Sequence, residues 1–187
     1  AADLMAISIA ELGGISERRL DRLVNPLVSG LPAYLVSEPG VNSGMMIVQY
    51  VAASLCAENK RFAVPAVTDN YVTSALQEDH LSMGTMAALK LLTVLENTNK
   101  ILAIEYLCAA QACEFIEPGS MGEGSFKAWQ LIRESIPSYD EDRWLAPEIE
   151  KSSLLVRSNT LLATHFADVQ YYLIVSKVAL KKDPFTL

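Results

Sequence analysis

Apolar residues recur at helical spacing along most of the chain, and no stretch alternates apolar and polar residues long enough to predict a strand. The pattern predicts a first helix over residues 1–28. The pair Gly13-Gly14, which costs roughly 2 kcal/mol of helix propensity relative to two alanines, leaves room for a break or a kink within it. A second helix is predicted over residues 42–62, where Asn42 or Ser43 would cap the exposed N–H groups.

The third predicted helix, over residues 81–115, is the most distinctive. It contains no proline, and at about 1.5 Å per residue it would be ~50 Å long. Such a length favours an elongated, oligomeric bundle over a compact globule. The polar run 96–100 interrupts its apolar pattern, so a partner or a kink is expected there. The apolar seam at bundle spacing consists of Leu81, Ala88, Leu92, Leu95, Leu102, Tyr106 and Ala109.

A glycine-rich turn then precedes three shorter predicted helices, over residues 125–135, 147–157 and 161–180. Pro147 suits the first turn of its helix, where the missing N–H costs nothing. The whole pattern predicts an all-α fold.

Composition narrows the class of protein. The chain has 187 residues, 51% of them hydrophobic, and a net charge of −7. This excludes a disordered chain, and three cysteines exclude a disulfide scaffold. The acidic balance argues against binding nucleic acid. No apolar run reaches the ~20 residues that span a membrane, and the start resembles no signal peptide, so we expect a cytoplasmic protein. The absent initiator Met is consistent with a fragment or a processed chain.

General catalytic motifs are scarce. Glu78, Asp79 and His80 are consecutive, so on a helix their side chains would diverge, and we expect no metal site there. Residues 68–83 form a polar segment before the longest helix. Within it Ser74 and Gln77 have the spacing of a capping box, which would place Glu78 in the first helical turn. The residues alone therefore favour capping over catalysis. Buried, inert thiols are expected at Cys56, Cys108 and Cys113.

A set of longer motifs resembles the aromatic amino acid lyase family, and its histidine ammonia-lyases most of all. Two stretches carry the resemblance: GLPAYLVSEPGVNSGMMIVQYVAASLCAENK at residues 30–60 and TSALQEDHLSMG at residues 73–84. Supporting motifs follow in the expected order. They are ISERRLDRLV, LENTNKILAIEYLCAAQACEF and YDEDRWLAPEIE.

The resemblance implies an elongated all-α bundle of long antiparallel helices in a homotetramer whose active sites combine several subunits. It implies an enzyme that releases ammonia from an aromatic amino acid, with urocanate as the product when the substrate is histidine. The reaction uses the prosthetic group 4-methylideneimidazol-5-one (MIO), which forms from an Ala-Ser-Gly tripeptide. This chain has no Ala-Ser-Gly. It resembles the C-terminal third of such an enzyme and is expected to be inactive alone, with MIO supplied from upstream. We expect one helical domain over residues 1–187, with long central helices over 1–116 and peripheral helices over 125–180.

The resemblance also implies roles for individual residues. Glu78 would be catalytic and would bind the substrate, since a carboxylate can accept a charge-assisted bond from an imidazole N–H. Relatives specific for phenylalanine or tyrosine tend to have Gln there, so Glu favours histidine. Met45 would line the pocket for the substrate ring, although a core position is an equal alternative. Gln77 would bind substrate, with His80 in support.

Two other functions stay open. The chain could be a non-catalytic helical oligomerisation module, or the corresponding part of a tyrosine or phenylalanine ammonia-lyase or aminomutase.

Overall fold

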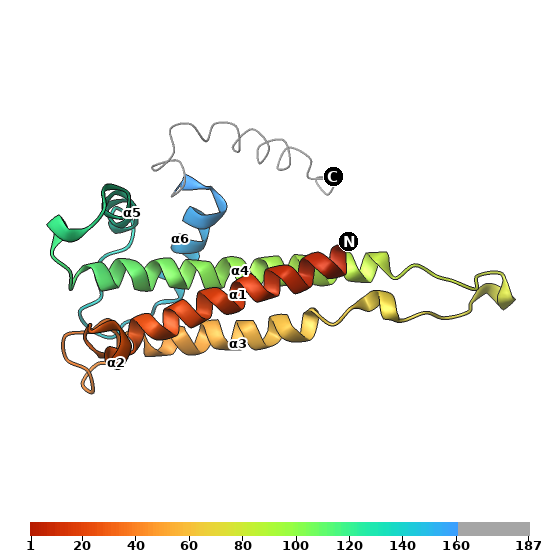
Figure 1. Ribbon diagram of the computed structural model, residues 1–187, viewed down its shortest axis with the longest axis horizontal. Helices are drawn as coiled ribbons and strands as arrows, with labels where there is room; N and C mark the ends of the chain where they lie inside the picture. Colours follow the sequence, from red (N-terminus) through yellow and green to blue (C-terminus); the bar gives the residue numbers. More distant parts are fainter. Residues whose placement is uncertain (161–187) are drawn as a thin grey trace.

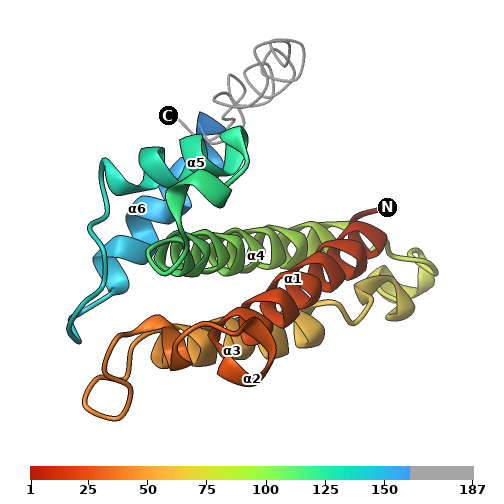
Figure 2. The ribbon, with the colours of Figure 1, turned by 60° about the vertical axis from the view of Figure 1, so that its left-hand side comes forward.

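The computed structural model describes residues 1–160, and these residues form helices and loops without any strand. Three long helices, α1 (Ala2–Val24), α3 (Met46–Phe62) and α4 (Gly84–Cys113), lie side by side in an elongated bundle (Figures 1 and 2). Helix α3 runs opposite to α1 and α4. The predicted all-α class and elongated shape are confirmed, whereas the helix predicted over residues 161–180 lies outside the described residues.

Shorter helices complete this part of the chain. Helix α2 (Pro26–Ser29) follows α1, while α5 (Glu123–Arg133) and α6 (Ala146–Arg157) lie against the end and the side of α4 (Figure 2). The helices predicted over residues 125–135 and 147–157 are thus confirmed, and Pro147 lies in the first turn as expected. Single 3-10 turns lie at Ala33–Leu35 (η1), Ala66–Thr68 (η2), Ser74–Leu76 (η3) and Pro118–Ser120 (η4).

Helix α1 passes through Gly13-Gly14 without a break, so the predicted kink is wrong. Gly13 is buried against α4, and a Cβ atom built on it would lie 3.3 Å from the side chains of Ile101 and Thr98. The absent side chain lets the two helices approach closely. Packing therefore offsets the poor helix propensity of the pair.

Two predicted helix ends are also corrected. The first helix ends at Val24 because Asn25 is extended, and the Asn25 side chain instead accepts the N–H of Leu27 to cap α2. Helix α3 begins at Met46, so neither Asn42 nor Ser43 caps it.

The first half of the apolar seam predicted for α4 lies on an exposed face, whereas Tyr106 near its end packs against the smaller core. Leu81 and Leu95 are exposed, and Leu92 is 62% exposed. The buried positions lie one residue earlier in the sequence. They are Ala87, Val94, Ile101 and Cys108. Because α4 is apolar on two adjacent faces, periodicity alone does not tell which face is turned inward.

The polar run in α4 causes no kink, which corrects that expectation, since the helix continues through it. Instead its side chains bond to neighbouring helices, α3 and α6 among them. Asn97 donates to Glu58 at 2.7 Å, Thr98 accepts from Asn59 at 3.0 Å, and Asn99 donates to Ser153 at 2.6 Å. This polar layer fixes the register of α3 and α6 on α4.

The main core lies between α1, α3 and α4, and a smaller one joins α4 to α5. Cys56 and Cys108 are buried as predicted, whereas Cys113 is half-buried. Burial raises the pKa of all three thiols, which keeps them protonated and unreactive near neutral pH.

Candidate functional site

The sequence-predicted site residues lie at opposite ends of the bundle. Met45 immediately precedes α3, whereas Gln77, Glu78 and His80 lie in the segment that joins α3 to α4, which extends beyond the helices (Figure 1). The 17 residues of α3 separate the two groups by roughly 25 Å. The structure therefore brings Gln77, Glu78 and His80 together but does not bring them to Met45 within one chain.

Residues 63–83, called the arm below, contact mainly themselves. Every residue from 67 to 82 is exposed. Thr73 and Glu78 exchange two backbone hydrogen bonds, at 2.9 and 3.2 Å, and the Asn70 amide lies 2.6 Å from the His80 ring. At the tip, Ser74, Ala75 and Leu76 have φ of 53°, 53° and 73°, a left-handed turn that is unfavourable for residues other than glycine.

The backbone of Glu78 pairs with Thr73, but its side chain caps no helix in the described part of the chain. Glu78 lies six residues before Gly84, the first residue of α4, so the expected capping box and first-turn position are wrong. Ser74 instead begins the turn η3, and its carbonyl accepts the N–H of Gln77. Among residues 1–160 nothing donates to the Glu78 carboxylate, which is exposed on the arm and able to accept a bond from outside.

The base of the arm is fastened to the bundle by two charged residues, the buried Asp3 and the half-buried Lys90. An oxygen of Asp3 on α1 accepts the N–H of Val67 at 3.0 Å, and its other oxygen lies 3.4 Å from the Lys90 ammonium on α4. Lys90 also donates to the carbonyl of Val64. Burial acts to raise the pKa of Asp3, but the N–H groups of Val67 and Ala66 and the charge of Lys90 outweigh it, so the pKa lies below its ordinary value.

Met45 is only 1% exposed and belongs to the main core. Its N–H donates to the carbonyl of Tyr34 at 2.8 Å, and its side chain belongs to the same buried cluster as Leu20, Leu35 and Val48. In this chain the position is thus a core position at the start of α3. Contact with a substrate ring stays a prediction.

The loop that leads into Met45, residues 30–45 (the entry loop below), has a constrained backbone. Tyr34 and Leu35 have φ of 54° and 56°, and Gly44 has φ of 57°. A Cβ atom on Gly44 would lie 2.5 Å from the Tyr34 carbonyl oxygen, so only glycine fits there.

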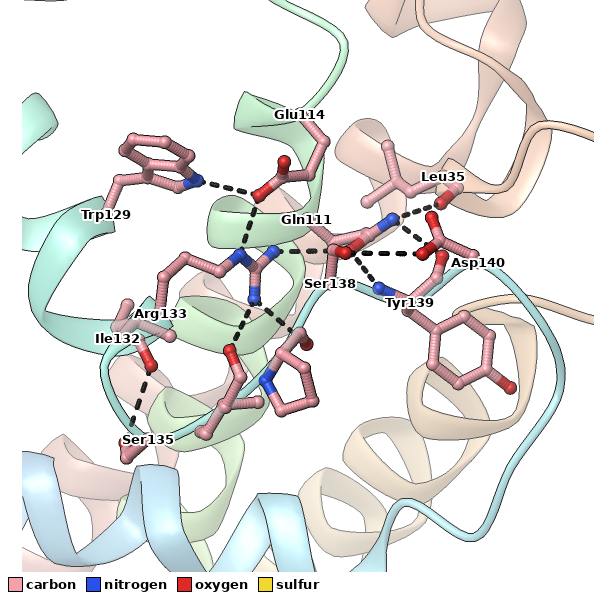
Figure 3. Close-up of polar contacts among 12 residues, drawn as sticks. Leu35, Gln111, Glu114, Trp129, Ile132, Arg133, Ser135, Ser138, Tyr139 and Asp140 are labelled. Atoms are coloured by element: carbon pink, nitrogen blue, oxygen red, sulfur yellow. Dashed lines mark hydrogen bonds and ion pairs between the residues drawn. The ribbon is translucent and has the colours of Figure 1, made fainter.

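Gln111, which sequence reasoning missed, holds this loop from the inside (Figure 3). Its amide nitrogen donates to the carbonyls of Leu35, at 3.1 Å, and Tyr139, at 2.9 Å. Its amide oxygen accepts the Tyr139 N–H at 2.9 Å and an Arg133 N–H at 3.2 Å. Arg133 also pairs with Glu114 at 2.6 Å. Gln111 is 2% exposed, so this group links three segments inside the fold.

Asp142 was missed as well. Its carboxylate accepts the backbone N–H groups of Ser43 and Gly44, directly before Met45. These pairs are 98 and 99 residues apart, and no local spacing rule links such distant positions.

Beside Asp142 lies a mostly apolar groove of about 360 Å³ between the start of α3 and residues 139–149, with Ile47, Val51 and Trp144 in its wall. Within residues 1–160, no group of His, Cys, Asp and Glu is arranged to hold a metal ion. The helices described include none that is long and apolar enough to cross a membrane.

Comparison with known proteins gives consistent matches. The family model described as aromatic amino acid lyase matches residues 1–134. Histidine ammonia-lyase from Natranaerobius thermophilus is 51% identical over 162 residues, covering 86% of this chain and 32% of that protein. The chain thus spans about a third of the length of the curated relatives it matches.

Two solved structures share the fold. Histidine ammonia-lyase from Trypanosoma cruzi superposes with a TM-score of 0.84 at 45% identity, covering 87% of this chain and 32% of that one. Tyrosine aminomutase from Streptomyces globisporus superposes with a TM-score of 0.85 at 33% identity, covering 90% and 33%. The fold is common to both activities, whereas sequence identity is higher to the ammonia-lyase.

Proposed function

The chain belongs to the aromatic amino acid lyase family, and from this premise we propose that it is the C-terminal part of an enzyme that eliminates ammonia from histidine. In this proposal Glu78 binds the substrate imidazole or amine and takes part in catalysis. Gln77 supports it on the same arm, and Met45 lines the pocket for the ring. The alternative is that the same part serves a tyrosine or phenylalanine lyase or aminomutase.

The observation that carries the proposal is the position of Glu78. Its exposed carboxylate lies at the far end of the arm and caps no helix. A charged acceptor held on a strained turn, without a partner among the described residues, suits a ligand that arrives from another segment. A glutamate rather than a glutamine favours a ligand with an N–H to donate, such as imidazole.

In this proposal, residues beyond this chain complete the site. The exposed apolar side chains of α1 and α4 support assembly with further copies of the chain. Helix α1 exposes Leu4 and Leu12, and α4 exposes Met86, Leu89 and Leu92. Many exposed large apolar side chains on neighbouring helices favour contact with another protein surface. We propose a homo-oligomer, a tetramer in the complete enzyme, in which the arm of one subunit meets the entry loop of another.

The prosthetic group of the family does not fit the residues of this chain. MIO forms from Ala-Ser-Gly, and the printed sequence contains no such tripeptide. The chain therefore cannot form the group itself, and the proposal assigns to its residues the binding and placement of the substrate and the catalytic role of Glu78.

The test is to express the complete open reading frame that encodes this chain and to follow urocanate absorbance with histidine. We expect Glu78→Gln to lower kcat/KM about tenfold or more, which corresponds to one lost charge-assisted hydrogen bond. Asp79→Asn is the matched control, because Asp79 is an equally exposed acid on the same arm. The control should leave kcat/KM unchanged.

Other outcomes would overturn parts of the proposal. Product from tyrosine or phenylalanine but none from histidine would assign the chain to a sister lyase or aminomutase. A reading frame that begins at Ala1, with no upstream Ala-Ser-Gly, would favour a non-catalytic oligomerisation module. Unchanged kinetics in Glu78→Gln would remove Glu78 from the site.

A further inference from the structure

The carboxylate of Asp142 reaches the entry loop from a segment almost a hundred residues later. Its two oxygens lie 3.0 and 2.8 Å from the Ser43 nitrogen, and one of them lies 3.0 Å from the Gly44 nitrogen. In return the Asp142 N–H donates to the Asn42 side chain at 3.1 Å. The contact is therefore made from both sides and covers the two residues that precede Met45.

Helix α3 needs such an acceptor. Its N-cap position is Met45, which has no side-chain oxygen, and no side chain among residues 1–160 caps its first turn. A negative charge near a helix N-terminus is favourable, because unpaired N–H groups give that end a partial positive charge. Asp142 supplies the charge just before the helix begins.

A second set of residues holds Asp142 in place. The Tyr139 hydroxyl donates to Asp142 at 3.0 Å and accepts the Arg143 N–H at 3.1 Å. The Arg143 guanidinium lies 4.7 Å from the centre of the Tyr139 ring and pairs with Glu148 at 2.8 Å. Asp142 itself is exposed, but the two residues that orient this segment, Tyr139 and Glu148, are buried, so its carboxylate is anchored to the fold through them.

We propose that Asp142 is a positioning residue for substrate recognition: it fixes the backbone at Ser43 and Gly44 and thereby sets the position of the Met45 side chain at the start of α3. This inference rests on the proposed function, in which Met45 lines the pocket for the ring. Asp142 itself touches no substrate. Its loss would leave the chemistry at Glu78 intact and loosen the fit of the ring.

The first experiment compares Asp142→Asn with Glu141→Gln in the complete protein. Asparagine keeps the shape of the side chain but loses its charge. One carboxylate oxygen is replaced by an NH₂ group, which cannot accept the backbone N–H groups of Ser43 and Gly44. We expect KM for histidine to rise about ten- to a hundredfold with kcat nearly unchanged, since displacement of a binding group by about an ångström has effects of this size. The neighbouring exposed acid Glu141 has no bond to the entry loop, so its variant should match the parent.

A milder variant keeps the test decisive if Asp142→Asn does not fold. Tyr139→Phe removes only the hydroxyl that orients the carboxylate, and we expect KM to rise about two- to fivefold, the equivalent of one hydrogen bond.

The substitution Met45→Leu supplies a coupling test. If Asp142 acts through Met45, the effects of Asp142→Asn and Met45→Leu on KM should be less than additive.

Amide exchange of residues 38–46, measured by mass spectrometry on the same proteins, tests whether Asp142 holds the entry loop independently of whether Met45 binds substrate. We expect faster exchange at Ser43 and Gly44 in Asp142→Asn and not in Glu141→Gln. An active parent whose KM is unchanged by Asp142→Asn would overturn the positioning role while the proposed function stands. A folded parent with no activity on any aromatic amino acid would overturn the proposed function. The exchange data would then still decide whether Asp142 holds the loop.

Discussion

The entry loop and the arm both connect long helices, and both contain consecutive residues in the left-handed region. In the entry loop these are Tyr34 and Leu35, and in the arm they are Ser74, Ala75 and Leu76. The entry loop is held by Gln111 and Asp142, whereas the hydrogen bonds described for residues 69–81 stay within the arm. The same kind of backbone strain is thus compensated in one loop by distant residues and in the other only locally. Substitutions in the two loops should therefore differ in their effect on global stability.

The largest effect is expected for Gly44→Ala. The new methyl group would meet the Tyr34 carbonyl at 2.5 Å in a backbone region unfavourable to alanine, so we expect a loss of roughly 3 kcal/mol in the free energy of unfolding by urea. The control is Gly14→Ala in α1, where nothing lies within 4 Å of the added atom. That variant should gain about 0.5–1 kcal/mol. Equal effects at both glycines would contradict the proposed constraint.

Gln111→Leu should have the next largest effect. It keeps the volume but leaves the carbonyls of Leu35 and Tyr139 and one N–H unpaired in the interior, so we expect a loss of roughly 2 kcal/mol. Gln130→Leu on the exposed face of α5 is the matched control and should stay within about 0.5 kcal/mol. A small effect at Gln111 would show that the entry loop is not held from inside.

Acid should weaken two contacts together: the contact of Asp142 with the entry loop and the contact of Asp3 with the base of the arm. Hydrogen bonds from Ser43, Gly44 and Tyr139 hold the pKa of Asp142 below the ordinary 3.8, against burial, and the pKa of Asp3 is also lowered. A lowered pKa stabilises the folded state only while the carboxylate is charged. The stabilisation is therefore complete at a pH above the pKa of the unfolded chain, and it is lost as the pH falls through the lower pKa of the folded state. We expect urea midpoints to fall below about pH 4, and to fall less in Asp142→Asn. An equal fall in both proteins would exclude Asp142 as a source of the acid sensitivity.

The smallest global effect is expected for Asn70→Ala in the arm. It removes the contacts to His80 and to the Leu81 N–H, all of which are exposed. We expect a change within about 0.5 kcal/mol in global stability but faster amide exchange across residues 70–82. A loss as large as that of Gln111→Leu would show that the arm is coupled to the core.

Local patterns predicted the helices but not their partners. Propensity and periodicity placed five helices of the described part to within about four residues. The same reasoning placed the first half of the seam of α4 on an exposed face, because Leu92 and Val94 are equally apolar and only the tertiary contacts distinguish them. It also assigned Glu78 to a cap, since Ser74 and Gln77 have the spacing of a capping box in any loop that precedes a helix. Gln111 and Asp142 join segments far apart in sequence, which no local rule connects.

The continuous exposure of residues 67–82 has a consequence for how the protein can evolve. Helices α1, α3 and α4 pack through surfaces to which the tip of the arm contributes nothing. Mutations there should be nearly neutral for folding, so selection can act on the residues around Glu78 for their effect on ligand choice alone. Under the proposed function the entry loop has no such freedom, because a change near Met45 would alter substrate fit and folding together. Diversification of specificity should therefore begin in the arm.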